Sequence, residues 1–341
     1  MINTYKTKIL SSKKDDLIYA AELLSAGEVV GIPTETVYGL AADATNNLSV
    51  AKIFTAKGRP ADNPLIVHLS DISDIELYVK EIPPLAYILA REFCPGPLTM
   101  VMKKRDIIPS ITSGGLDTVG IRIPYHKIAR ELIKLSGKPL AAPSANLSGS
   151  PSPTQAMHVF HDMNGRVPAI IDGGSCPVGV ESTVISFEND GIRLLRPGFI
   201  TVEDFENMGI TVYRDKGIIE ETPFGEKVLS PGMKYKHYSP KANVTIINSD
   251  LDNFNEYIKK HNNDDTYAMI FDYDKGYYPF GNYMTYGNDS KEQAAQLFDV
   301  LRRFDEINAK QIYARCPSTE GIGLAVYNRL LRAAGFEVIH L

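Results

Sequence analysis

Cysteine is scarce in this chain, and its cysteines are scattered. The 341 residues include three, Cys94, Cys176 and Cys316, and no two of them have the spacing of a metal-binding pair. A sparse, odd number of cysteines is typical of proteins from reducing compartments. We therefore expect a cytoplasmic protein, and we expect it to have no resident metal site.

Long hydrophobic runs are also lacking. No apolar stretch approaches the roughly 20 residues that a helix needs to cross a bilayer. The first residues, 1–16, contain no apolar core long enough for a signal peptide. We expect no association with a membrane.

Basic residues are not in excess, because the formal net charge is -5. Proteins that coat nucleic acid without sequence preference are usually basic, so the charge argues against that class and leaves room only for a local basic pocket. Three common active-site signatures are absent as well: the GxxxxGK[ST] phosphate loop, the GxGxxG dinucleotide motif and the GxSxG nucleophile turn.

The pattern of helices and strands changes along the chain, which is long enough for two domains. Up to residue 206 it favours a mixed sheet, with helices over 15–27 and 47–57 (the second capped by Asn47) and strands that include 28–32 and 65–69. Residues 207–241 are rich in Gly, Pro, Ser and Lys, which indicates a linker. Strands and helices then alternate over 242–341, which predicts a smaller α/β/α domain of three layers with a mainly parallel sheet.

The segment KGRPADNPLIVHL combines two cations, Lys57 and Arg59, with two prolines and a short apolar run that contains His68. An ammonium and a planar guanidinium held close together suit phosphate oxygens, and proline reduces the entropy lost on binding. Two simpler explanations stay open: the cations complement the dipole of the preceding helix, and His68 belongs to the core.

Other polar residues stand at predicted strand ends, where open sheets bind ligands. PTETVYGL contributes Thr34 and Thr36, although either hydroxyl could instead cap a following helix. APSANLSGSPSPT contributes Ser144 and Asn146 among small residues that let the backbone approach a ligand. Arg122 lies inside an apolar strand and needs an anionic partner, for which a ligand carboxylate and a structural acid serve equally.

Further along the chain, Ser182 and Thr183 enter a strand, and Arg196 ends one. Together with the preceding segments they give several cations, hydroxyls and glycine-rich turns at strand ends. The residues thus predict an anion pocket for a phosphate-bearing ligand, together with a second ligand that carries a carboxylate.

Taken in order, PTETVYGL, KGRPADNPLIVHL, PGPLT, VGIRIP, APSAN, GVESTV and LRPG resemble the motifs of YrdC-like domains. SPGMKYKHYSP and GIGLAVYNRLLRAAGF resemble the linker and C-terminal domain of the two-domain members, the threonylcarbamoyl-AMP synthases. The resemblance implies a YrdC-like catalytic domain over 1–206, a linker over 207–241 and a Rossmann-like α/β domain over 242–341.

The activity that this resemblance implies joins L-threonine, bicarbonate or carbon dioxide, and ATP with Mg²⁺ into threonylcarbamoyl-adenylate, a precursor for the modification of tRNA. A separate transferase complex would use the product, and contact with tRNA itself is not required. The family's catalytic signature would fall on Lys57, Arg59, Ser144 and Asn146. ATP would meet Lys57, Arg59, Asn63, Thr118, Ser144, Ser152, Arg196, Tyr235, His237 and Tyr238. Threonine would meet Thr34, His68, Arg122, Ala142 and Ser182.

Three points stay open from the sequence. Tyr235, His237 and Tyr238 form either a lid over the nucleotide or part of an ordinary linker. Glu35 and Asp43 are both possible general bases. The rival functions are an RNA-binding module without catalysis, disfavoured by the acidic charge, and a carbamoyltransferase that uses carbamoyl phosphate. Relatives of the latter kind carry zinc-binding and acylphosphatase-like segments that this chain lacks.

Overall fold

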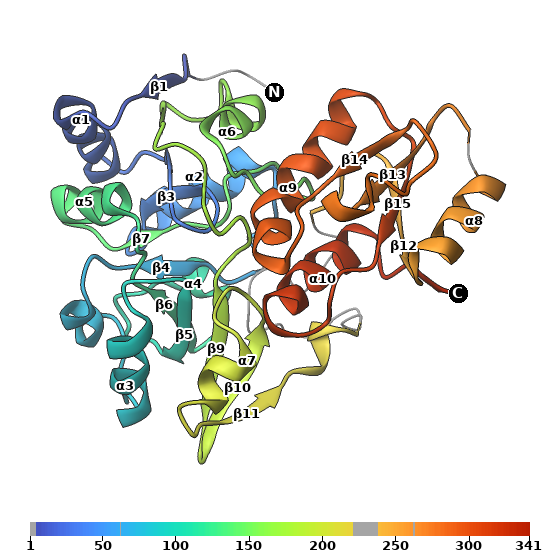
Figure 1. The fold of residues 1–341 in the computed structure, drawn as a ribbon. Coiled ribbons are helices and arrows are strands. Elements are labelled where there is room, and N and C mark those ends of the chain that lie inside the picture. Colours follow the sequence, from blue (N-terminus) through green and yellow to red (C-terminus); the bar gives the residue numbers. More distant parts are fainter. Residues whose placement is uncertain (1–4, 62, 221–237, 262) are drawn as a thin grey trace.

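The computed structural model describes residues 5–61, 63–220, 238–261 and 263–341. Figure 1 shows two α/β bodies, one running from blue to yellow and the other from orange to red. None of the helices within these ranges combines the length and the apolar composition that crossing a membrane requires.

The first body is built on an eleven-stranded sheet in the order β1-β8-β2-β3-β7-β4-β6-β5-β9-β10-β11. Both parallel pairs, such as β4 with β6, and antiparallel pairs, such as β5 with β6, occur, which confirms the predicted mixed sheet. The strands are β1 (Lys8–Leu10), β2 (Val30–Ile32), β3 (Gly39–Asp43), β4 (Ile66–His68), β5 (Leu98–Lys103), β6 (Thr118–Arg122), β7 (Leu140–Ala141), β8 (Ala169–Ile171), β9 (Thr183–Glu188), β10 (Gly191–Arg196) and β11 (Thr211–Arg214).

Helices flank this sheet, as predicted. They are α1 (Lys14–Ser25), α2 (Asn47–Lys57), α3 (Pro84–Phe93), α4 (Ser110–Ser113), α5 (Lys127–Ser136), α6 (Ala156–Met163) and α7 (Val202–Glu206), with the short 3₁₀ turns η1 (Ile72–Leu77) and η2 (Lys216–Ile218). The predicted cap of α2 is wrong by one residue: Asn46, not Asn47, has extended backbone, and its side chain accepts from the amides of Leu48 and Ser49. No helix follows Thr34 and Thr36, because the next element is the strand β3.

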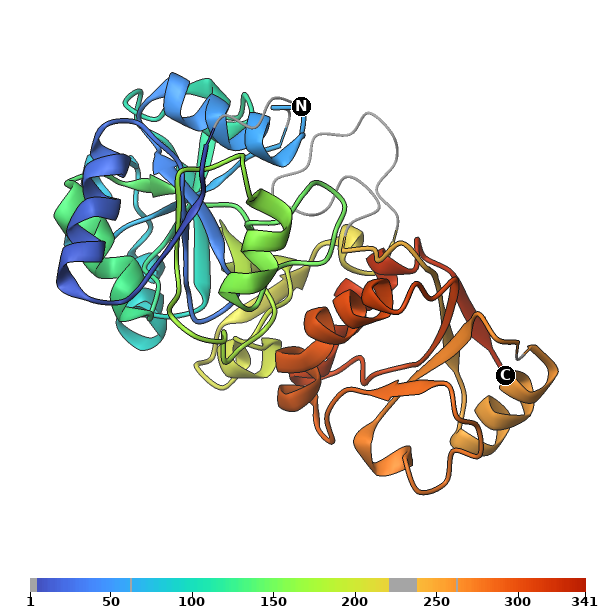
Figure 2. The ribbon, with the colours of Figure 1, turned by 90° about the horizontal axis from the view of Figure 1, so that it is seen from above.

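The second body has a five-stranded sheet in the order β14-β13-β15-β12-β16. Every pair in it is parallel, which confirms the predicted mainly parallel sheet. Helix α8 lies on one face, and α9 and α10 lie on the other, next to the first body (Figures 1 and 2). The elements are β12 (Asn243–Asn248), α8 (Leu251–His261), β13 (Thr266–Ile270), η3 (Asp272–Asp274), β14 (Tyr283–Thr285), α9 (Ser290–Glu306), β15 (Gln311–Arg315), α10 (Gly321–Ala333) and β16 (Val338–His340).

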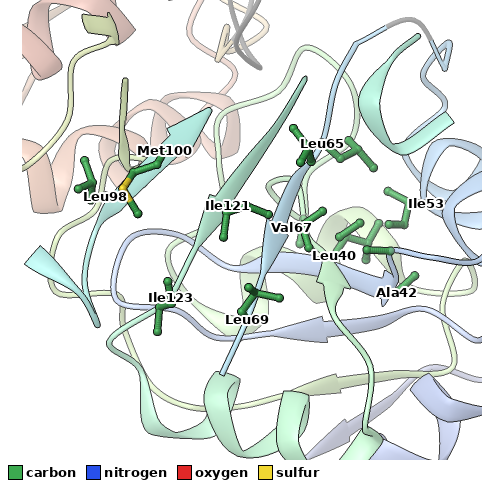
Figure 3. Close-up of a cluster of buried hydrophobic side chains, with 14 of the residues drawn as sticks. Leu40, Ala42, Ile53, Leu65, Val67, Leu69, Leu98, Met100, Ile121 and Ile123 are labelled. Atoms are coloured by element: carbon green, nitrogen blue, oxygen red, sulfur yellow. The ribbon is translucent and has the colours of Figure 1, made fainter. Parts of the chain in front are cut away.

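Alternation along β4 separates the core from the functional face. Leu65, Val67 and Leu69 point into the core shown in Figure 3, together with Ile121 and Met100 from neighbouring strands. Successive side chains of a strand point to opposite faces, so Ile66 and His68 face the other way, toward a cavity. The same alternation on β6 puts Ile121 in the core and Arg122 at the cavity.

The boundary between the two bodies is predicted near residue 206. Beyond it, β11 pairs in parallel with β10, so the first sheet continues into part of the predicted linker. One hydrophobic cluster also spans the two bodies, since Val37 and Val180 pack with Leu297, Phe298 and other residues of the second. Apolar packing therefore holds α9 and α10 against the first body.

Candidate active site

Loops and strand ends that are distant in sequence line one cavity. Its walls include many of the predicted site residues: Thr34, Arg59, His68, Arg122, Ala142, Ser144, Ser182, Arg196 and Tyr238. Thr36, Val37, Gly39, Ile66, Pro143 and Glu181 complete the lining. Three arginines line this cavity: Arg59 follows α2, Arg122 ends β6 and Arg196 ends β10.

The Lys57–Arg59 bend meets the Ser144–Asn146 turn. The Lys57 Nζ atom donates to the carbonyl oxygen of Ser144 and, at 2.9 Å, to that of Asn146. The Ser144 hydroxyl in turn donates to the Asn146 side-chain oxygen at 2.5 Å. Lys57 is 2% exposed and lies behind the turn, whereas Arg59 lines the cavity. Lys57 therefore shapes the turn, and Arg59 faces the cavity.

Helix geometry explains why the two cations diverge. Helix α2 ends at Gly58, whose positive φ of 63° forms a left-handed cap that most side chains would strain. This residue turns the chain out of the helix, so Arg59 leaves the direction that Lys57 follows. An interaction of both cations with the helix dipole would not explain why Lys57 is buried behind the turn while Arg59 lines the cavity.

Arg122 has a protein partner on the strand-end loop. Its Nη2 atom donates to the Glu35 carboxylate at 2.6 Å, and both side chains are buried. Burial alone would raise the pKa of Glu35, but the charge and hydrogen bond of Arg122 hold it below its usual value. The Nε atom of Arg122 is buried and has no hydrogen-bond partner within the described residues. Arg122 thus pairs with a structural acid through Nη2 and keeps a second buried donor, Nε, that no described residue accepts.

The two acids considered as general bases occupy different settings. Glu35 is ion-paired next to the cavity, whereas the Asp43 carboxylate accepts from the amide and hydroxyl of Thr45 at 2.9 and 2.6 Å. Asp43 is thereby part of a turn and is absent from the cavity lining. The arrangement does not mark either acid as a base.

Ser182 and Arg196 are joined across β9 and β10. The Arg196 Nε and Nη2 atoms donate to the Ser182 carbonyl at 3.1 and 3.0 Å, and the Ser182 hydroxyl lies 2.8 Å from that of Thr99. Burial lowers the pKa of Arg196 to about 10, so the side chain remains a cation at neutral pH. This pair places a fixed positive charge beside a hydroxyl in the cavity wall.

Asn63 and Thr118 do not line the cavity. Asn63 is fully buried, and both polar atoms of its amide are without a partner in the part of the chain that the structure describes. Thr118 opens β6 and is half-buried. Ser152 is buried and donates to the Glu181 carboxylate at 2.5 Å.

Of the predicted aromatic lid, only Tyr238 can be placed. Tyr235 and His237 lie outside the described residues. Tyr238 is buried, lines the cavity and packs on Phe298 of α9 with ring centroids 5.2 Å apart. An aromatic side chain from the predicted linker therefore contacts both bodies.

Glu181 is a charged cavity residue that the sequence analysis did not single out. It follows the small residues of DGGSCPVGV and directly precedes Ser182, so it has the pattern of an ordinary strand-entry acid. Its partner Arg329 is separated from it by 148 residues, with Nε 2.9 Å from the carboxylate. No local spacing in the sequence signals such a pair.

His68 sits at the cavity as a neutral imidazole. Its Nδ1 atom lies 3.2 Å from the carbonyl oxygen of Ile66, which makes Nδ1 the protonated nitrogen and leaves Nε2 as an acceptor. Burial and the nearby charge of Arg122 lower the pKa of His68 to about 3. The histidine can thus accept a hydrogen bond from a ligand without adding charge.

This buried histidine predicts a pH dependence of stability. Between about pH 3 and the unperturbed pKa of about 6.5, the unfolded chain binds a proton that the folded chain does not. The free energy of unfolding should therefore fall as the pH is lowered from about 6.5, by up to ~1.4 kcal/mol per pH unit from this residue. Urea unfolding of His68→Gln should show a shallower loss than the unaltered chain. The exposed His340 is the control position, and equal slopes for His68→Gln and the unaltered chain would contradict the assignment.

Two family models match the chain. The first, described as "Telomere recombination" and named for Sua5, YciO and YrdC, matches residues 22–198. The second, described as "Threonylcarbamoyl-AMP synthase, C-terminal domain", matches residues 200–335. The matches meet close to the predicted domain boundary.

Relatives and solved structures match over nearly the whole length. The threonylcarbamoyl-AMP synthase of Bacillus subtilis is 44% identical over 98% of this chain and 97% of its own. The enzyme of that name from Pyrococcus abyssi is 43% identical over 94% of each chain. A crystal structure described as P. abyssi Sua5 complexed with L-threonine matches with a TM-score of 0.92 and 40% identity, covering 98% of this chain and all of that one.

Proposed function

We propose, from the premise that this chain belongs to the threonylcarbamoyl-AMP synthase family, that it forms L-threonylcarbamoyladenylate and pyrophosphate from L-threonine, bicarbonate or carbon dioxide, and ATP. The observation that carries the proposal is the meeting of the Lys57–Arg59 bend with the Ser144–Asn146 turn at a cavity that also contains Arg122. Such a cavity presents cations suited to the phosphates of a nucleotide and to the carboxylate of an amino acid.

ATP occupies the side of the cavity with Arg59, Ser144 and Arg196. In the transfer step, negative charge grows on the phosphate oxygens, and preorganised cations in a site shielded from water stabilise it strongly. Arg59 and Arg196 supply that charge, while Lys57 holds the Ser144 turn in place. The rest of the proposed ATP site consists of Asn63, Thr118, Ser152, Tyr235, His237 and Tyr238, and Asn63 brings a buried amide whose polar atoms need partners.

L-Threonine occupies the side with Arg122 and His68. The buried Nε donor of Arg122 suits the α-carboxylate of threonine, and Nε2 of His68 suits a hydroxyl or ammonium donor. Thr34, Ala142 and Ser182 form the rest of this proposed subsite. The L-threonine complex of the similar P. abyssi protein supports an amino acid as one ligand.

The chemistry follows from the two ligands. The amine of threonine adds to carbon dioxide and loses a proton, which gives a carbamate. A carbamate oxygen then attacks the α-phosphorus of ATP, and the bond to the β-phosphate oxygen breaks as pyrophosphate leaves. Carbamates decompose readily in water, so buried walls such as Ile66, Val37 and Ala142 protect the intermediate.

The side chains around the cavity fit Mg²⁺ only if the ion is bound to the nucleotide. Mg²⁺ is usually held by one or two carboxylates together with substrate phosphates. Here Glu35 pairs with Arg122 and Glu181 with Arg329, and no group of three His, Cys, Asp or Glu side chains is placed to hold a metal among the described residues. Mg²⁺ would therefore be bound mainly by triphosphate oxygens and would neutralise part of their charge.

We place the reaction in the cytoplasm, with a separate transferase complex passing the threonylcarbamoyl group to tRNA. The enzyme itself needs no contact with tRNA in this scheme. The relatives lend no support to the RNA-binding or carbamoyl-phosphate alternatives.

Mass spectrometry tests the proposed reaction directly. The protein is incubated with ATP, Mg²⁺, L-threonine and isotopically labelled bicarbonate, and each component is omitted in turn. We expect a labelled threonylcarbamoyladenylate only in the complete mixture. Unlabelled product, or the same adenylate without threonine, would contradict the proposed reaction.

A further inference from the structure

The second body inserts one arginine into the wall of the cavity. Arg329, on α10, is the largest of the fully buried side chains, at 0% exposure. Its Nε donates to a carboxylate oxygen of Glu181 at 2.9 Å, its Nη2 donates to the Glu181 carbonyl at 3.2 Å, and its Nη1 donates to the Pro197 carbonyl. All three guanidinium nitrogens therefore contact the first body, and Nη1 also donates to the Asn328 side chain of α10 at 3.2 Å.

These contacts surround the proposed ATP subsite. Glu181 directly precedes Ser182, and Pro197 directly follows Arg196. The second carboxylate oxygen of Glu181 accepts from Ser152 at 2.5 Å. One guanidinium thus fixes the backbone next to two cavity residues, Ser182 and Arg196, and, through Glu181, the hydroxyl of the buried Ser152.

Charge gives this arrangement a role beyond packing. Glu181 is 7% exposed and lines the cavity. Burial alone would raise the pKa of Glu181, but the charges of Arg329 and then Arg196 hold it low. An ionised carboxylate in this wall repels a triphosphate and attracts Arg196, unless another cation neutralises it. Arg329 is the cation in direct contact.

We propose that Arg329 is a positioning residue for ATP, which neutralises Glu181 from the second body, so that this carboxylate does not repel a triphosphate bound beside it in the cavity. The inference rests on the proposed function, since it assumes that ATP is the ligand beside Arg196. In this arrangement the second body completes the nucleotide side of the cavity.

The contact also makes nucleotide binding depend on domain docking. If α10 moves away from the first body, Glu181 loses its hydrogen-bonded cation, and its negative charge then opposes a triphosphate in the cavity. Breaking a buried pair from one side is costly, because it leaves an uncompensated charge in the protein. ATP affinity and correct docking of the second body are therefore coupled.

The test compares Arg329→Met with Arg332→Met in the full chain. Arg332 lies on the same helix and also reaches the first body, where its Nη2 donates to the Gly217 carbonyl at 2.7 Å, but it does not contact Glu181. Calorimetric titration with ATP and Mg²⁺ measures binding without turnover. We expect Arg329→Met to weaken ATP binding by about 10-fold or more, and Arg332→Met to leave it within about 2-fold.

A second substitution separates charge from packing. Arg329→Met combined with Glu181→Gln removes the unpaired carboxylate, and we expect it to recover ATP binding to within about 3-fold of Glu181→Gln alone. ATP binding by Arg329→Met should also improve as the pH is lowered and the lone Glu181 becomes protonated. Circular dichroism of each variant confirms folding at the temperature used, and Arg329→Gln, which also removes the charge, serves if Arg329→Met does not fold.

The outcomes distinguish the inference from the proposed function. Undiminished ATP binding by a folded Arg329 variant would overturn the inference alone. A loss of binding that Glu181→Gln does not relieve, and that does not change with pH, would assign Arg329 to packing and overturn it too. An unaltered chain that does not bind ATP would overturn both.

Discussion

Replacing Arg59 with alanine is expected to slow formation of threonylcarbamoyladenylate by about 100-fold or more, which is a typical loss for a group that stabilises charge in the transition state. Arg59 lines the cavity at the end of α2, whereas Lys57 is buried behind the Ser144 turn. Arg59 is therefore the member of this pair that can follow the charge developing on the phosphates. Pyrophosphate release at saturating ATP and threonine measures the effect.

Two variants give this measurement its controls. Lys52 lies on the same helix but pairs with Glu28 at 2.8 Å, so Lys52→Ala removes a cation from α2 without touching the cavity. It should turn over at nearly the normal rate. Arg59→Lys keeps the charge but loses the planar fork, so its rate should fall between the two. Near-normal turnover by Arg59→Ala would remove Arg59 from the mechanism.

Strands and turns could be predicted where the relevant signal is local. The strand predicted over 65–69 contains β4, whose alternation places Val67 in the core and His68 at the cavity. The proline and glycine residues around Arg59 and Ser144 mark turns, and turns at strand ends meet where the strands are neighbours. The mixed sheet of the first body and the parallel sheet of the second were likewise predicted, because helices and strands alternate regularly only in the second part of the sequence.

The partners of the buried charges could not be predicted from local patterns. A buried arginine requires an anionic partner, but the sequence does not identify that partner. For Arg122, the sequence therefore did not distinguish a ligand carboxylate from a structural acid. The structure supplies Glu35, 87 residues away. Glu181 and Arg329 are still farther apart and belong to different bodies. The tertiary fold brings the members of such a pair together. The residues next to each member in the sequence do not indicate which distant residue it will contact.

The largest combined effect on stability and activity is expected for Arg122→Met. Arg122 is 4% exposed and is the hydrogen-bonded cation of the buried Glu35. Removing it leaves an unpaired buried carboxylate, so the free energy of unfolding should fall by about 3–5 kcal/mol. The same change removes the proposed donor to the threonine carboxylate, so KM for threonine should rise by roughly 100-fold. Urea unfolding and threonine-dependent pyrophosphate release measure the two effects.

The double variant Arg122→Met with Glu35→Gln separates these effects. A neutral amide next to methionine no longer leaves a buried charge unpaired, so most of the lost stability should return. Threonine binding should not return, because the donor to its carboxylate is still missing. If the double variant is both stable and normal toward threonine, Arg122 serves only to balance Glu35, and the threonine carboxylate must bind elsewhere in the cavity. If stability returns while KM for threonine stays high, the same guanidinium balances a structural acid and binds the ligand.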